Sequence, residues 1–230
     1  VVDSDSATLD TVTFANTVGN AAVAIDSINI GSATSAGNAI FMGAIGGGAA
    51  VTAINVTGGD VVGETSSIKT NASATFTAMT LDENTAQVTA TFDGGTVTIT
   101  GDVQGGAAGE GNVIINATAA TFASNGGIGN STSVRSIVIG SANNATATIF
   151  NGAINTTSIT IGGETNANVH AVSFFDNNNS AHSIIGTIDA GAANDTVSIN
   201  VLDAATGAAP TAITFTSNVG ATAGVDSLLI

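Results

Sequence analysis

The sequence predicts an all-β chain that folds as a parallel β-solenoid with short strands and Gly/Asn turns. First, Thr, Val and Ile, which favour strands, are abundant, whereas charged residues make up only 8% of the chain. Second, short runs such as Thr96–Thr100 alternate between Thr and an aliphatic residue, so that one face points inward. Third, a strand–turn–strand pattern recurs along the chain, as in stacked repeats.

The expected strands are short runs separated by turns that contain Gly, Asn or Asp. Each run is rich in β-branched or aromatic residues and is too short for a helix of ordinary length. The runs are Thr11–Phe14, Val23–Ile30, Ala39–Met42, Val51–Val56, Ala74–Met79, Gln87–Phe92, Thr96–Thr100, Val113–Asn116, Val134–Ile139, Ala147–Phe150, Thr157–Ile161, Val169–Phe175, Ser183–Ile188, Thr196–Val201, Ala212–Thr216 and Val225–Ile230.

A finer motif recurs within this series: a Phe, three small or polar residues, and then Val or Ile. It occurs at Phe14…Val18, Phe41…Ile45, Phe150…Ile154 and Phe215…Val219. Stacked units of this kind predict rungs of about 20 residues, each adding about 4.8 Å to a rod. The alternative is one or more β-sandwich domains, but sandwich cores usually contain a Trp or Tyr, and this chain has neither.

The two ends of the chain carry the same longer pattern. Phe14–Gly19 returns as Phe215–Gly220, and Ile25–Ile30 returns as Val225–Ile230. We therefore expect residues 1–230 to form a single elongated repeat domain. Residues 1–30 and 201–230 are expected to be equivalent segments of a superrepeat of about 200 residues.

Composition excludes several classes of partner. Two basic residues stand against 17 acidic ones, giving a formal net charge of −15. Nucleic acids and anionic lipid headgroups both need a basic surface, so neither is expected to bind. No apolar run is long enough to cross a bilayer as a helix, so no membrane insertion is expected. The chain has no cysteine, so its stability must come from β ladders and repetition.

The segments Ala39–Ile45, Ala147–Ile154 and Thr157–Gly162 resemble the β-strand repeats of bacterial surface proteins. These include the passengers of rickettsial-type surface-antigen autotransporters, giant adhesins and surface-layer-like proteins. The resemblance implies an extracellular, β-helical and non-catalytic protein of the bacterial cell surface.

The function expected from these features is structural. The chain would form a filament, a surface layer or an adhesin stalk by end-to-end β stacking, with copies of itself as partners. The main alternative is an adhesin or carbohydrate-binding module for host or environmental glycans. Weaker alternatives are a β-helical polysaccharide-active enzyme and an ice-binding protein. No enzyme activity and no catalytic residue is expected, because one Lys and one Arg cannot form a clustered basic site.

The candidate metal ligands are Asp189 and Asp195. The segment Ala190–Val197 resembles a single nonapeptide of the repeats-in-toxin Ca²⁺ roll, in which Asp195 would be a ligand and Asp189 would assist. Such rolls need tandem copies, so an ordinary turn is the competing interpretation. His170 and His182 could form a metal pair on adjacent rungs, although ordinary strand positions explain them as well. No other cofactor is expected.

Overall fold

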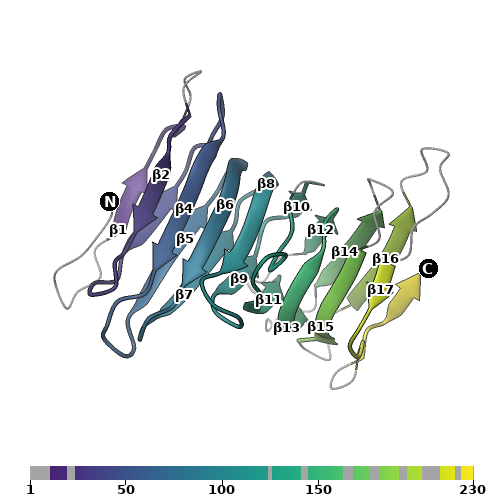
Figure 1. The fold of residues 1–230 in the computed structure, drawn as a ribbon. Coiled ribbons are helices and arrows are strands. Elements are labelled where there is room, and N and C mark those ends of the chain that lie inside the picture. Colours follow the sequence, from purple (N-terminus) through teal and green to yellow (C-terminus); the bar gives the residue numbers. More distant parts are fainter. Residues whose placement is uncertain are drawn as a thin grey trace.

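The computed structural model of the chain is a parallel β-solenoid (Figure 1). It describes residues 11–19, 24–123, 126–140, 145–162, 168–176, 182–191, 196–203, 213–220 and 224–229. Those residues form eighteen strands and no helix. Every pair of neighbouring strands is parallel, as in the pairing of β1 with β3 and of β16 with β18, so the predicted fold class is confirmed and the sandwich alternative is wrong.

The strands form two sheets of nine, with strands of odd number in one sheet and strands of even number in the other. The first sheet contains β1 (Thr11–Phe14), β3 (Asn38–Phe41), β5 (Thr65–Thr70), β7 (Gln87–Phe92), β9 (Asn112–Ile115), β11 (Val134–Ile139), β13 (Ile154–Ile161), β15 (His182–Ala190) and β17 (Ile213–Phe215). The second sheet contains β2 (Ser27–Ile30), β4 (Val51–Thr57), β6 (Ala74–Asp82), β8 (Thr96–Gly105), β10 (Ala119–Phe122), β12 (Thr146–Phe150), β14 (Val169–Asp176), β16 (Thr196–Asp203) and β18 (Ser227–Leu229).

The pairing register shows that each turn of the solenoid has three sides, which we call columns. Column 1 stacks the inward residues Val12, Ala39, Ile68, Ala90, Val113, Ile137, Ile159, Ile188 and Val219. Column 2 stacks Val97, Ala120, Thr148, Val172, Ile199 and Leu228. Column 3 stacks Ile28, Ile54, Met79, Val103, Ile128, Ile154, Ile184 and Phe215.

Four long strands, β6, β8, β13 and β15, pass from one column to the next by bending. The β6–β8 ladder shifts register between Thr75 and Ala78, and the β13–β15 ladder shifts between Asn155 and Ser158. At two of the bends a glycine has positive φ, Gly101 at 129° and Gly186 at 131°. A Cβ on Gly101 would lie 2.1 Å from the carbonyl oxygen of Phe76, so only glycine fits the corner of β8.

The core follows from strict alternation within each side. In β8, Val97 and Ile99 are fully buried while Thr96 and Thr98 are exposed. The interior is a continuous cluster of Val, Ile, Ala and Phe that runs from turn to turn. Small and β-branched side chains suit this narrow interior, which explains the composition of the chain.

All sixteen predicted runs overlap strands, whereas β5 and β10 were not predicted. A turn of the solenoid is also longer than the predicted rung of about 20 residues. Thr80 and Gln104, which are neighbours in adjacent turns, are 24 residues apart in the sequence. Gly186 and Ser217, near the C-terminal end, are neighbours at a spacing of 31 residues. The difference arises because each turn has three sides and three corners, and some corners carry long connections.

The first and last described strands lie at opposite ends of the solenoid (Figure 1). β1 and β2 form one end, and β17 and β18 form the other. Much of 1–30 and 201–230 falls outside the described residues, including 1–10 and 204–212. The single-domain organisation and the equivalence of the two segments as parts of a superrepeat therefore stay predictions.

Candidate functional site

At the two ends of the solenoid, apolar side chains are exposed at column positions that are buried in the inner turns. In column 1, Val12 is 41% exposed, whereas the next seven residues of the same column are at most 1% exposed. In column 2, Leu228 is 48% exposed, whereas the five residues before it are at most 1% exposed. The side chains are of the same kind and point inward in the same way. Their exposure therefore reflects their place in the first and last described turns and not a different local structure.

Partial burial of apolar side chains shows the same pattern. The hydrophobic residues that pack against the core without being fully buried all lie in the first or last described turn: Phe14, Val18, Ile25, Ile28, Ile213, Phe215, Val219 and Val225. The first and last described turns therefore leave part of the apolar core uncovered by other described residues. Contiguous apolar surface of this kind marks an interaction site.

The backbone is unpaired at the same places. Among the described strands, β1 pairs only with β3, and β17 pairs only with β15. In the other sheet β2 and β18 likewise have one neighbour each. An edge strand presents a row of N–H and C=O groups that can pair with another chain, and Pro or Lys would blunt such an edge. Neither residue occurs in these four strands.

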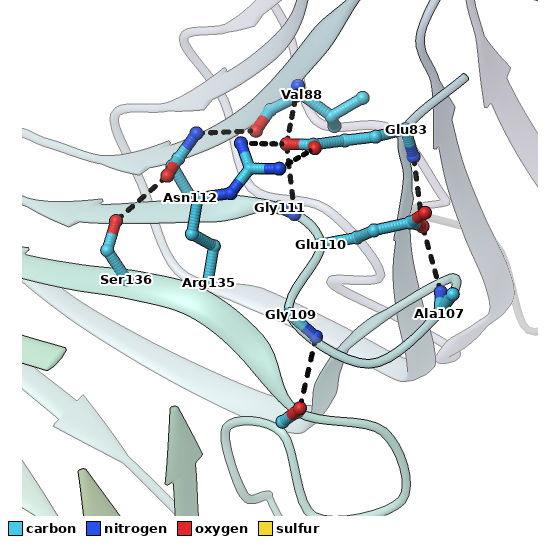
Figure 2. Close-up of polar contacts among 10 residues, drawn as sticks. Glu83, Val88, Ala107, Gly109, Glu110, Gly111, Asn112, Arg135 and Ser136 are labelled. Carbon is cyan, nitrogen blue, oxygen red and sulfur yellow. Dashed lines mark hydrogen bonds and ion pairs between the residues drawn. The ribbon is translucent and has the colours of Figure 1, made fainter. Parts of the chain in front are cut away.

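A polar cluster at one corner is the second feature of note (Figure 2). The Glu83 carboxylate accepts hydrogen bonds from the Arg135 guanidinium, at 2.9 Å from Nη1 and also from Nη2. The same carboxylate accepts from the backbone N–H groups of Val88 and Gly111 at 3.4 and 3.2 Å. The Glu110 carboxylate accepts from the N–H groups of Glu83 and Ala107 at 3.2 and 2.8 Å.

These contacts connect three successive turns of the solenoid. Glu83 follows β6, Glu110 precedes β9, and Arg135 lies in β11. The Glu83 side chain is only 8% exposed, while that of Arg135 is 41% exposed. Burial first, and the nearby charge of Glu110 second, raise the pKa of Asp82 at this corner. Because the carboxylates are occupied by backbone N–H groups and by Arg135, we interpret the cluster as a structural staple.

The second basic residue is also used within the fold. Lys69 Nζ lies 2.5 Å from Asp93 Oδ2, linking β5 to the end of β7 in the next turn. The hydrogen bond from Lys69 lowers the pKa of Asp93 in spite of partial burial, and the Gly94 N–H adds to the effect at 2.7 Å. Both basic side chains of the chain are thus engaged by carboxylates of neighbouring turns. Neither is placed to recruit an anionic ligand.

The predicted metal ligands are placed as follows. Asp189 is a half-buried residue of β15, where it pairs in register with Thr160 of β13. Asp195 lies outside the described residues. Within the described ranges no group of three or more His, Asp or Glu side chains could hold a metal ion. The Ca²⁺ pair therefore stays a prediction.

Buried polar residues interrupt the apolar columns at a few positions. His170 is fully buried in β14, and its Nδ1 lies 2.9 Å from Thr146 Oγ1 of β12. His182 begins β15 on a different side of the turn. The hydroxyls of Thr70 and Thr148 are buried without a hydrogen-bond partner among the described residues. Thr70 stands between Phe41 and Phe92 in one row of column 1, so it leaves a gap in a row of rings.

Comparison with known proteins finds no match: no family model, no curated protein and no solved structure resembles this chain significantly. No helical segment able to cross a lipid bilayer occurs in the part of the chain that the structure describes. The geometry of the chain itself is therefore the basis for assigning a role to its surfaces.

Proposed function

We propose that this chain is an extracellular structural repeat protein that stacks end to end with copies of itself, forming a filament, a surface layer or an adhesin stalk. The observation that carries the proposal is the exposure of Val12 and Leu228 in columns that are otherwise buried. A further turn of the same kind, placed on either end, would cover these side chains and pair the open backbone edges.

Head-to-tail stacking suits the chemistry of the two ends. Because all strands are parallel, the C-terminal end of one copy and the N-terminal end of the next can form one continuous ladder. Two different surfaces meet in this contact, so it is heterologous and leads to an open polymer. The surface location rests on the resemblance to bacterial surface repeats and on a composition without cysteine and nearly without basic residues. In this role the Glu83–Arg135 staple and the Lys69–Asp93 pair hold successive turns together.

The proposal is tested by measuring assembly of the purified chain against protein concentration, by light scattering and electron microscopy. Val12→Lys and Leu228→Lys each place a charge at one end face. Each variant should raise the critical concentration for assembly at least tenfold. Thr98→Lys is the matched control, because Thr98 is exposed on β8 in the middle of the solenoid and should leave assembly unchanged. A wild-type chain that stays monomeric at millimolar concentration, with native far-ultraviolet circular dichroism, would refute the proposal.

A further inference from the structure

The phenylalanine rings form two runs of contacts along the solenoid, Phe14 with Phe41 and Phe92 through Phe215, and we call both runs together the ring spine. Thr70 separates the two runs. Phe14 stacks on Phe41 in column 1, with ring centroids 4.6 Å apart and planes 6° apart. Farther along, Phe122, Phe150 and Phe174 stack in column 2, with interplanar angles of 23° and 17°. Within a column the rings are therefore nearly parallel.

Between columns the rings meet edge to face. Phe92 of column 1 meets Phe122 of column 2 at 5.5 Å and 90°. Phe174 of column 2 meets Phe215 of column 3 at 5.5 Å and 85°. Both geometries are favourable for aromatic pairs. The spine thus starts in column 1 at one end, is interrupted at Thr70, and finishes in column 3 at the other end.

The Phe-x-x-x-Val/Ile motif explains how the spine can change columns. From Phe41 to Ile45 the motif leads from column 1 to column 2, because Ile45 pairs with Ala74 and thereby lines up with Ile99 of β8. From Phe150 to Ile154 it leads from column 2 to column 3. From Phe215 to Val219 it leads from column 3 to column 1. The same motif therefore builds all three corners, and it does not fix the column in which it begins.

The two similar end segments consequently lie in different columns. Phe14 and Val18 occupy columns 1 and 2, whereas their counterparts Phe215 and Val219 occupy columns 3 and 1. Likewise β2 belongs to column 3, whereas its counterpart β18 belongs to column 2. The C-terminal end therefore repeats the N-terminal pattern after rotation about the solenoid axis by one column.

We propose that a second copy of this chain docks on the C-terminal end rotated by one column, so that its β1 pairs with β17 and its β2 pairs with β18. This inference rests on the proposed end-to-end stacking and specifies its register. It places like on like: Phe14 over Phe215, Val18 over Val219 and Ile28 over Leu228. The ring spine then continues across the joint with Phe14 stacked in the column of Phe215.

The backbone groups of the two edges fit this register. The Phe14 carbonyl accepts a hydrogen bond from the Met42 N–H, so the backbone N–H and C=O of Phe14 point toward β3. The backbone N–H and C=O of the adjacent residue, Thr13, therefore point away from β3. The Ile184 carbonyl accepts from Thr216 N–H, so the groups of Phe215 face away from β15. With Thr13 over Thr214, the N–H and C=O of Thr13 meet the open C=O of Ile213 and the open N–H of Phe215.

An unrotated joint would also pair the backbones but would mismatch the side chains. It places β2 over β17, with Ile28 over Phe215, and it places Val12 over Val219, following the existing columns. Phe14 then has no ring beneath it, and the spine ends at the joint. The rotated joint does place Asp26 over Asp226, so assembly should strengthen as added salt screens this pair.

The register is tested with paired cysteines, since the chain has none of its own. Neighbouring parallel strands are about 4.8 Å apart, which is within the Cα separation of a disulfide. Thr13→Cys with Thr214→Cys reports the rotated joint. Thr11→Cys with Asn218→Cys reports the unrotated joint, and Thr13→Cys with Leu229→Cys reports rotation in the other direction. All five positions are exposed, so the substitutions leave the core intact.

Each variant is oxidised with diamide under assembling conditions and resolved by denaturing electrophoresis without reductant. The expected result is a ladder of covalent oligomers for Thr13→Cys with Thr214→Cys, in at least tenfold excess over the other two variants. Cross-linking of either other variant, or assembly in which no variant cross-links, would overturn the rotated joint while leaving end-to-end stacking intact. Failure of the uncross-linked wild-type chain to assemble would overturn both.

Discussion

Removing Arg135 should destabilise the solenoid much more than removing Lys69, although each is one partner of an ion pair. Arg135→Met leaves the Glu83 carboxylate, 8% exposed, with only the N–H groups of Val88 and Gly111. Removing one partner of a buried pair costs about 3–5 kcal/mol, and the 41% exposure of Arg135 lowers this to about 2–3 kcal/mol. Lys69→Met breaks a pair whose side chains are 38% and 29% exposed, which costs less than about 1 kcal/mol.

The assay is hydrogen exchange of the backbone amides of β7 and of Gly111, just before β9, together with urea unfolding, because repeat proteins can open locally without unfolding as a whole. Arg135→Met should increase exchange at Val88 and Gly111, and 0.5 M NaCl should not remove the effect. The smaller effect of Lys69→Met should shrink in the same salt. Equal costs for the two variants, or a cost of Arg135→Met that disappears in salt, would refute the staple interpretation.

Two further substitutions and one pH dependence give expected changes of known sign. Thr148→Val should stabilise by about 1 kcal/mol in urea unfolding, because it removes a buried hydroxyl without a partner among the described residues; a destabilised variant would contradict this. Gly140→Ala should destabilise by more than about 2 kcal/mol, because φ is +78° and the new Cβ would lie 2.3 Å from His170 Cε1; normal stability would contradict it. The ionised Asp93 carboxylate stabilises the fold fully above the ordinary carboxyl pKa, and this stabilisation is lost as pH falls through the lowered pKa of Asp93 in the folded state. Lys69→Met should therefore weaken the dependence of the unfolding free energy on pH below pH 4, and an unchanged dependence would contradict this.

Alternation of Thr with Val or Ile predicted most strands, and the recurring motif together with the lack of Trp and Tyr favoured a solenoid over a sandwich. The two strands that were missed show where this signal fails. β5 has the sequence TSSIKT and buries Ser66 and Thr70 on its inward face, so it has no apolar alternation to detect. β10 is a four-residue strand whose inward residues are Ala120 and Phe122. Small and hydroxyl side chains fit the interior only because the turns above and below are already in place.

The polar staple could not be predicted from sequence for a related reason. Glu83 and Arg135 are 52 residues apart, and they meet only because two full turns separate them. The length of a turn varies along the solenoid, so sequence spacing does not predict which corner residues will be neighbours. Lys69 and Asp93, which lie one turn apart, could have been paired only once the length of that turn was known.

The column shift between the two ends has a simple origin in the repeat. Among the described residues, Phe215 is the eighth and last member of column 3, whereas Phe14 belongs to column 1 in the first described turn. The interval between these two rings therefore spans seven complete turns and two of three sides. A superrepeat that contains a non-integral number of turns must rotate each successive unit by one column. After three successive units, the total rotation is three columns, and equivalent residues lie again on the same side of the rod.

An assembled rod with this repeat would present the Glu83–Arg135 corner on each of its three sides in succession. The rotation follows from a motif that builds every corner equally well, so it needs no separate device at the joint. Electron microscopy of an assembled wild-type sample should show an axial repeat of three chain lengths. A filament that repeats after a single chain length would mean that copies dock without rotation, with Val12 over Val219 and with the ring spine broken at every joint.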